Sequence, residues 1–431
     1  MPVTRTQVPL DPDWKGVPPD AGLRTTGDLA ATGWHPADGH LNLPLLSLDL
    51  PTFEANVSTM LALCQAHGAA IAPHIKTPMA PDIARMLLAA GAWGVSVADL
   101  RQAGVMLRSG LRRLLLANEI GGRAAAGRLA ALLGQHADAE LTLFVDSPRG
   151  VADLAAAWAE DEALPPLHLL VEVGCGRGGT ESQDEVEDVI AAIAGSGDPR
   201  LALAGVAAYE GTARRPDAAA TARELDALFG RIETALAAVR TAVPERALLL
   251  SAGGSSLFDH VLTRCGPLAA ADGGTLLLLR SGACFFCDHG PVRERLEELA
   301  ARRLLGPDWN ARIETSFQPT LRLWGEVLSL RSDGTAICGI GMRDVAHDQG
   351  LPVPLTAWRG GRPASDLRGT ASVDRLNDQH AFVTARGAGL EVGDVIEFGV
   401  RHPCTTLDKH GAIYALNERG KLTAVLHTCF G

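Results

Sequence analysis

The sequence predicts an α/β protein in which a (β/α)₈ TIM-like barrel is followed by a β-rich C-terminal domain. Short apolar segments alternate with Ala- and Leu-rich helical stretches between about residues 40 and 290, and such alternation predicts parallel βαβ units. Eight units over about 250 residues match one barrel. After about residue 310 the segments become short, partly alternating and separated by Gly, Asp and Asn, which is typical of β structure.

The expected barrel strands are the apolar segments Ala69–His74, Trp93–Val97, Arg113–Asn118, Leu141–Val145, Leu167–Val173, Ala202–Tyr209, Leu248–Ser251 and Thr275–Arg280. The expected helices include Pro81–Ala90, Arg123–Leu133, Val151–Ala159, Asp184–Ala194 and Ala218–Ala242. A charged helix, Val292–Leu305, completes a barrel domain that we expect to cover residues 51–305.

We expect the β-rich domain to cover residues 306–431. Its expected strands include Thr320–Leu330, Thr335–Gly339, Ala381–Thr384 and Val395–Val400. One strand from residues 1–50, Leu43–Leu50, is expected to join it, and Pro51 then begins a helix.

Composition excludes several classes of partner. The net charge of −11 and the pI near 5.6 argue against nucleic acid and against an anionic membrane surface. No apolar run approaches roughly eighteen residues and the N-terminal stretch is polar, so we expect neither a transmembrane helix nor a secretory signal. Eight cysteines are too sparse for a disulfide scaffold, which favours reduced thiols and a cytoplasmic protein.

Lysine is scarce, which makes one lysine informative. Of the 39 basic residues only Lys15, Lys76, Lys409 and Lys421 are lysines. Lys76 follows the first expected barrel strand, at the end where barrels place their chemistry. A desolvated lysine there can act as an amine nucleophile and form a Schiff base, which an arginine cannot. His74 lies two residues earlier, on the same side of the strand.

Small-residue loops follow the last two barrel strands. The first contains Gly253, Gly254 and Ser255, and the second contains Ser281 and Gly282. Their backbone N–H groups and hydroxyls suit an anion, and these loops form the usual phosphate site of a barrel. A lysine nucleophile beside a phosphate site is what pyridoxal 5′-phosphate requires.

A metal pair is expected near the C-terminus. His402 and Cys404 are alternate residues of an expected extended segment, so their side chains could share a soft divalent ion such as zinc. The alternative is that His-Pro-Cys is only a bend. Further contenders for ligands are Asp378, His380, Asp408 and His410.

Three other features have both a functional and a packing interpretation. Arg177 is expected on the functional rim, where it could contact a carboxylate or the phenolate oxygen of the cofactor. Tyr209 could pack on a flat cofactor or simply belong to the core. The Cys284–Cys287 pair has CxxC spacing, but its aromatic neighbours favour plain burial.

Together these residues resemble the D-serine dehydratase/D-threonine aldolase family, which is related to alanine racemase in the type III pyridoxal-phosphate fold. The matching segments, in the family's order, are Ala72–Thr77, Gly91–Gly94, Gly205–Gly211, Ser251–Gly254, Leu279–Gly282, Asn377–His380 and His402–Cys404.

This resemblance implies a homodimer in which Lys76 carries the pyridoxal phosphate and the two small-residue loops hold its phosphate. It also implies a zinc-assisted reaction on a small D-amino acid, with His402 and Cys404 as metal ligands. Cys404 favours a dehydratase that converts a 3-hydroxy D-amino acid, such as D-serine or D-threonine, into a 2-oxo acid and ammonia. Ala283–Cys284 departs from relatives that carry a tyrosine or similar polar residue there.

Three alternatives remain open at this point. An aldolase would use the same residues to cleave a 3-hydroxy D-amino acid to glycine and an aldehyde. A non-catalytic pyridoxal-phosphate-binding protein would use the barrel alone. A racemase would need a second base, for which Tyr414 is the spare tyrosine. The substrate side chain stays undetermined among serine, threonine and 3-hydroxyaspartate.

Overall fold

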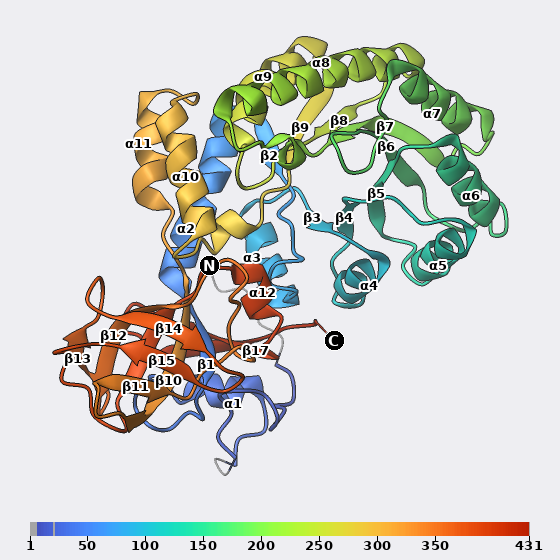
Figure 1. The fold of residues 1–431 in the computed structure, drawn as a ribbon. Helices are drawn as coiled ribbons and strands as arrows, with labels where there is room; N and C mark the ends of the chain where they lie inside the picture. The colour runs from blue at the N-terminus through green and yellow to red at the C-terminus, as the bar shows by residue number, and fades with distance from the viewer. Residues whose placement is uncertain (1–6, 20–21, 431) are drawn as a thin grey trace.

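The computed structural model describes residues 7–19 and 22–430, and its ribbon has two parts (Figure 1). The larger part contains a parallel sheet whose strands are β2 (Ala69–Ile71), β3 (Val95–Val97), β4 (Arg113–Leu116), β5 (Glu140–Val145), β6 (Leu167–Val173), β7 (Leu201–Ala208), β8 (Leu248–Ser251) and β9 (Thr275–Leu279). Their order is β2-β9-β8-β7-β6-β5-β4-β3, so each strand after β3 pairs with its neighbour in sequence.

The two end strands of this curled sheet are also joined. The Trp93 N–H donates to Ile71 O at 2.9 Å, and the segment after β2 exchanges two bonds with Ser96, from Ser96 N to Pro73 O at 2.9 Å and from Ile75 N to Ser96 O at 2.8 Å. The predicted TIM-like barrel is therefore confirmed. Its functional edge is the one where the carboxyl ends of all eight strands meet.

Helices surround the sheet on the outside (Figure 1). They are α2 (Leu50–Ala66), α3 (Pro81–Ala90), α4 (Leu100–Arg108), α5 (Arg123–Gly134), α6 (Pro148–Trp158), α7 (Gln183–Gly195), α8 (Ala218–Ala242) and α9 (Phe258–Asp272), followed by α10 (Pro291–Arg302) and α11 (Pro307–Ser316). Several begin at residues that commonly start helices, such as a capping side chain or a proline in the first turn. In α2, Asp49 accepts the Thr52 N–H at 3.1 Å just before Pro51, which is an N-cap followed by a proline in the first turn.

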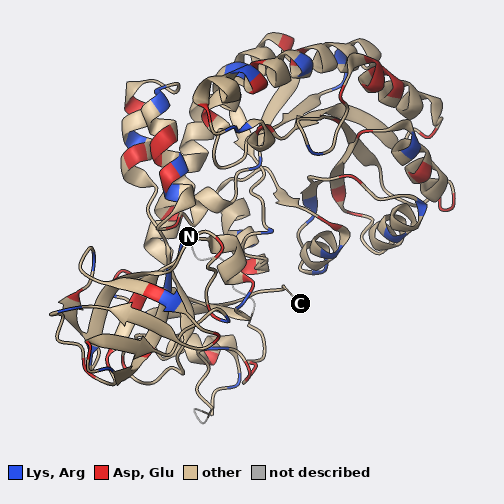
Figure 2. Cartoon of the chain, viewed as in Figure 1, with Lys and Arg blue, Asp and Glu red and all other residues tan. Residues whose placement is uncertain are grey.

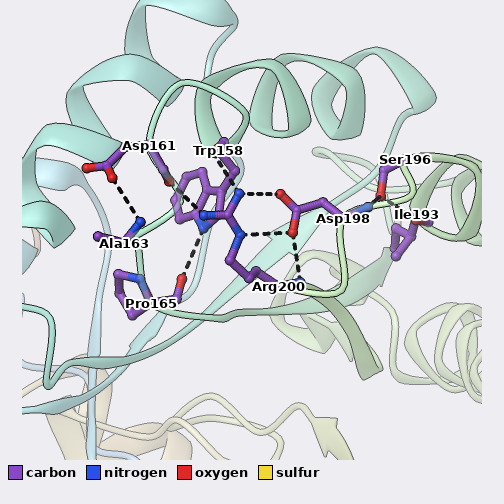
Figure 3. Close-up of polar contacts among 8 residues, drawn as sticks. All are labelled: Trp158, Asp161, Ala163, Pro165, Ile193, Ser196, Asp198 and Arg200. Atoms are coloured by element: carbon purple, nitrogen blue, oxygen red, sulfur yellow. Dashed lines mark hydrogen bonds and ion pairs between the residues drawn. The ribbon is translucent and has the colours of Figure 1, made fainter.

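The opposite edge of the barrel is tied by Arg200, which lies just before β7 (Figure 3). Its guanidinium donates to Trp158 O at 2.7 Å and to Asp161 O at 2.6 Å, after helix α6. It also pairs with Asp198 at 2.6 Å. One side chain thereby joins the loops that precede β6 and β7. These bonds serve stability, because the N-terminal edge of a barrel carries no catalytic loops.

The second part is β-rich, as predicted. Its strands are β1 (Leu45–Asp49), β10 (Leu321–Leu330), β11 (Thr335–Cys338), β12 (Val353–Arg359), β13 (Arg362–Asp366), β14 (Ser372–Leu376), β15 (Ala381–Thr384), β16 (Val395–Gly399), β17 (Ala412–Leu416) and β18 (Leu422–His427). β1 lies between β10, to which it is antiparallel, and β17, to which it is parallel. Two short helices, α1 (Thr26–Ala31) and α12 (Pro403–Leu407), accompany these strands.

The two parts share one apolar core. Phe53 of α2 packs on Phe286 with ring centroids 5.4 Å apart, and both belong to the cluster that continues through Leu321 and Leu323 of β10. Burial of this continuous surface holds the barrel edge against the β domain. The division at 51–305 and 306–431 stays a prediction.

Charged side chains of both signs mix on the outer helices, and the sheet interiors are largely uncharged (Figure 2). No helix in the described ranges is both long enough and apolar enough for a membrane span.

Candidate active site

A cavity of about 310 Å³ lies at the carboxyl edge of the barrel and is closed on one side by the β domain. It gathers ten of the residues predicted from the sequence, and these are His74, Lys76, Arg177, Tyr209, Gly254, Ser255, Ser281, Gly282, His402 and Cys404. Residues up to about 330 positions apart in the chain therefore meet in one place. Of the predicted site residues, Gly253 lies outside the lining.

Lys76 lies in a tight turn at the barrel edge. The Met79 N–H donates to Ile75 O at 2.8 Å, and Met79 adopts a positive φ of 41°, an unfavourable conformation for a residue with a side chain. The Lys76 amine is accessible within the cavity but surrounded by protein. Desolvation lowers its pKa, and the cationic Arg177 and Arg280 add to that lowering. Together they exceed the opposite effect of the neighbouring Cys404, so the neutral amine is favoured.

His74 lies against the loop that follows β9. A Cβ placed on Gly282 would come within 2.5 Å of His74 O, so only glycine allows this approach. His74 Nδ1 is buried without a hydrogen-bond partner. Desolvation, reinforced by Lys76 and Arg280, lowers the pKa of His74 well below its usual value, so its imidazole is neutral.

Arg177 and Tyr209 lie next to each other on the cavity wall. The Arg177 guanidinium lies 5.0 Å from the centre of the Tyr209 ring, a cation–π distance. Burial and the neighbouring Glu210 raise the pKa of Tyr209, which keeps its hydroxyl protonated. The pair presents a flat aromatic surface and a cation to whatever occupies the cavity.

The N–H groups of the Gly253–Gly254 loop do not face the cavity as predicted. They do surround an anion, but the anion is the buried carboxylate of Glu210, which accepts from Gly253 N at 3.0 Å and from Gly254 N at 2.6 Å. These donors were expected to face a phosphate. Glu210 takes them because it follows Tyr209 directly at the end of β7, opposite the loop.

Hydrogen bonds on the side away from the cavity fix the loop that follows β9. Ser281 Oγ donates to Gly253 O at 3.0 Å, which ties the two small-residue loops together. Arg280, buried beneath them, donates to Ser251 Oγ at 2.9 Å and to Ala208 O at 2.7 Å. At this end the cavity is lined by Ser255, Ser256, Ser281 and Gly282. Ser255 Oγ accepts the Cys284 N–H at 3.3 Å, which leaves its own O–H to donate.

His402 and Cys404 are not in an extended segment, contrary to our expectation. His402 is the N-cap residue of α12, and Pro403 begins that helix. The two side chains nevertheless meet, and their contact raises the pKa of His402 to about 9, with Asp348 contributing. His402 Nδ1 lies 2.7 Å from Asp348 Oδ2 and 2.9 Å from Thr405 Oγ1. Cys404 Sγ lies 3.2 Å from Thr77 Oγ1.

This donor set fits a metal with open coordination positions. The Nδ1 of His402 is held by a carboxylate, which is the outer contact that metal-binding histidines commonly make. An imidazole and a thiolate are zinc-type donors. The described residues contain no cluster of three or more His, Cys, Asp or Glu placed for one metal ion, so water or substrate would complete the coordination.

The remaining alternatives lie away from the cavity. None of Asp378, His380, Asp408 and His410 lines it. Tyr414 is buried in the β domain, where its hydroxyl donates to Lys15 O at 2.9 Å. Cys284 and Cys287 are buried, and burial raises both thiol pKa values to about 12, in agreement with the packing interpretation. All eight cysteines are free thiols.

Sequence reasoning missed Glu210, Asp348 and Arg280. Glu210 and Arg280 stood beside residues that were singled out, so their place at the ends of strands was a usable signal. Asp348 lies in a loop 54 residues before His402, and no spacing rule connects them.

Two family models match the chain. One, described as "Alanine racemase, N-terminal domain", matches residues 48–266, slightly over half of the chain. The other, described as "Putative serine dehydratase domain", matches residues 320–416. The two matches follow the two parts of the fold.

Curated relatives match most of the chain. A 3-hydroxy-D-aspartate aldolase of Paracoccus denitrificans is 24% identical over 86% of this chain and 88% of its own length. A D-threonine aldolase of Arthrobacter is 26% identical over 88% and 90%. A D-threo-3-hydroxyaspartate dehydratase of Delftia is 28% identical, over 33% of this chain and 37% of its own.

Solved structures share the fold. The D-threonine aldolase of Filomicrobium marinum has a TM-score of 0.71 at 24% identity, over 90% of this chain and 95% of its own. The dehydratase of Delftia has a TM-score of 0.65 at 20% identity, over 92% and 99%. An alanine racemase of Clostridium difficile has a TM-score of 0.59 at 12% identity, over 89% and 97%, and confirms the predicted alanine-racemase-like fold.

Solved variants of a D-threo-3-hydroxyaspartate dehydratase have alanine in place of a histidine and, in a metal-free form, in place of a cysteine. The two altered residues lie two positions apart, the same spacing as His402 and Cys404.

Proposed function

The chain belongs to the family that combines an alanine racemase N-terminal domain with a serine dehydratase domain, and from that premise we propose that it is a pyridoxal-phosphate-dependent, metal-assisted dehydratase of 3-hydroxy D-amino acids. One observation carries the proposal. The candidate metal ligand Cys404 contacts Thr77, the residue next to Lys76, at 3.2 Å. A basic amine and a pair of metal donors therefore meet in one cavity, which is what removing a Cα proton and a β-hydroxyl together requires.

The chain's own residues have distinct tasks. Lys76 would hold the cofactor, and its amine, once displaced by the amine of the substrate, would take the Cα proton, a task that its lowered pKa favours. His74 and Tyr209 line the same space, and Arg177 supplies a cation for the phenolate oxygen. Ser255, Ser281 and Gly282 would border the phosphate of the cofactor, and Gly254 lies in the same wall, whereas Gly253 lies outside the lining. Bound pyridoxal phosphate would supply an electron sink for the charge left at Cα.

His402 and Cys404 would hold a divalent metal, with zinc the best match to an imidazole and a thiolate. The bound metal would supply a Lewis acid for the departing β-hydroxyl. Asp348 fixes the orientation of His402, and Thr77 fixes Cys404. Loss of water and hydrolysis of the resulting enamine give a 2-oxo acid and ammonia. The histidine–cysteine spacing shared with the dehydratase variants supports this outcome.

Aldol cleavage to glycine and an aldehyde is the second candidate. It is favoured by relatives, because the aldolases match 86–88% of the chain whereas the curated dehydratase matches 33%. The non-catalytic alternative has less support, since it leaves His402 and Cys404 without a role. Homodimer formation and a cytoplasmic location stay predictions.

The test is product analysis with D-serine, D-threonine and D-threo-3-hydroxyaspartate, with pyridoxal phosphate and with or without a chelator. A chelator-sensitive 2-oxo acid with ammonia is the expected result. Glycine with an aldehyde would move the assignment to the aldolase. No turnover, while the protein still shows the visible absorbance of lysine-bound cofactor, would overturn the substrate class and leave the cofactor assignment standing.

A further inference from the structure

Helix α10 lies beside the phosphate end of the cavity, and one of its charged residues is unusual. Charged side chains along α10 are paired: Arg293 with Glu297 at 2.9 Å, Glu294 with Arg401 at 3.1 Å, Glu298 with Arg214 at 2.7 Å, and Arg302 with Asp259 at 2.7 Å. Arg295 is the exception. It has no hydrogen bond or ion pair among the described residues, and it lines the cavity.

The position of Arg295 follows from the geometry of its helix. Arg302 Nη2 donates to Ser256 O at 3.1 Å, so this face of α10 lies along the loop after β8. Arg295 is seven residues before Arg302, which is two turns, so it shares that face about 10 Å nearer the helix N-terminus. The cavity wall there includes Ser255, Ser256 and Val292.

The backbone N–H groups that would ordinarily donate to a phosphate at this end of the cavity already donate to carboxylates of the protein. Glu210 occupies the N–H groups of Gly253 and Gly254. Asp288, which is 1% exposed, occupies the N-terminus of α10, because its Oδ1 accepts from Gly290 N at 2.8 Å, Val292 N at 3.0 Å and Arg293 N at 3.3 Å.

Two buried carboxylates thus lie close to where a phosphate would bind, and each repels a second anion. Arg280 lies in the same wall and offsets the charge of Glu210, but Asp288 has no ion pair among the described residues, so a further cation would favour a phosphate here. An unpaired guanidinium in the cavity wall meets this need, since arginine binds phosphate oxygens through two parallel N–H bonds.

We propose that Arg295 is the cationic partner of the cofactor's phosphate group. The inference rests on the proposed function only for the identity of the cofactor. It adds a residue that the sequence did not single out, and it makes α10 part of the cofactor site.

The experiment compares the dissociation constants of pyridoxal phosphate and pyridoxal, which differ only in the phosphate group, for the wild type and Arg295→Gln. The variant should bind pyridoxal phosphate about 10- to 100-fold more weakly and pyridoxal within about threefold of the wild type. Arg295→Lys should fall between them. Arg293→Gln, on the exposed face of the same helix, is the matched control and should leave both constants unchanged.

An unchanged constant for pyridoxal phosphate in Arg295→Gln would overturn the inference. If the KM for 3-hydroxyaspartate, but not for D-serine, rose in the same variant, Arg295 would instead bind a carboxylate of the substrate. Failure of the cofactor assignment is distinguishable, since the wild type itself would then show no visible absorbance from lysine-bound cofactor. Failure of the proposed reaction would change the products and leave both dissociation constants as they are.

Discussion

The Asp348 carboxylate and the His402 imidazole are joined at 2.7 Å, from Oδ2 to Nδ1. This contact leaves the other ring nitrogen of His402 for a metal and fixes the ring relative to Cys404. Asp348 belongs to a loop and His402 to the start of α12, so the fold of the β domain, and not local sequence, creates the pair.

Replacing Asp348 with Asn should therefore weaken metal binding. The amide cannot stabilise the bound histidine as a carboxylate does, and loss of such an outer contact lowers metal affinity about 10- to 100-fold. Zinc titration against a competing chelator measures this. Asp366→Asn, on an exposed strand of the same domain, is the control. Equal zinc affinity in both variants would show that Asp348 serves only packing.

Replacing Lys76 with Ala should abolish the visible absorbance of lysine-bound cofactor and lower turnover by about 10³-fold or more. The turn at Ile75–Met79 is closed by a backbone bond from Met79 N to Ile75 O, in which the Lys76 side chain takes no part, so the fold should persist. Absorbance, kinetics and the melting temperature are compared with Lys421→Ala, whose side chain pairs with Asp38 far along the chain. A Lys76→Ala variant that keeps its turnover would remove Lys76 from the mechanism.

The regular parts of this fold could be predicted because they depend on local pattern. All eight barrel strands were placed, and so were β1, β10, β11, β15 and β16. Helices α4 and α9 were not among the helices named from the sequence, and each contains a residue that weakens helical periodicity. Gly104 is inside α4, and Pro267 is inside α9.

Site residues of a rare type could be predicted from the sequence. Site residues whose role depends on long-range contacts could not. Lys76 stood out by scarcity, and the cavity brings it together with His402 and Cys404. The use of the Gly253–Gly254 donors could not be read from sequence, because a glycine loop shows that an anion fits but not which anion occupies it. Glu210 does so from 43 residues away.

Replacing Glu210 with Ala should destabilise the protein. The N–H groups of Gly253 and Gly254 would lose their acceptor, and the buried one, of Gly253, costs about 1–3 kcal/mol when unsatisfied. Glu210→Gln should cost less, because its amide oxygen still accepts one bond. Urea unfolding of both variants measures the difference, with Glu233→Ala, at an exposed position of α8, as control. An Ala variant as stable as the control would mean that water replaces the carboxylate.

Glu119 should make stability depend on pH in an unusual direction. Burial, the hydrogen bond that protonated Glu119 donates to Glu172, and the charges of Glu172 and Asp146 raise the pKa of Glu119 to about 9. In the unfolded chain the pKa is near 4.5, so between about pH 4.5 and 9 the folded state binds more protons. Stability should therefore fall as pH rises through this range.

Replacing Glu119 with Gln removes that dependence, because the amide stays neutral and still donates to the Glu172 carboxylate. We expect the variant to match the wild type near pH 5 and to exceed it by at least about 1 kcal/mol near pH 9. Urea unfolding at both pH values measures this, and Glu187→Gln on the surface of α7 is the control. The Cβ position of Gly178, next to Arg177, lies 3.7 Å from both carboxylates, so ionisation of the pair should also loosen the loop that carries Arg177. Parallel pH profiles for wild type and variant would instead mean that the folded protein accommodates both carboxylates in their charged form.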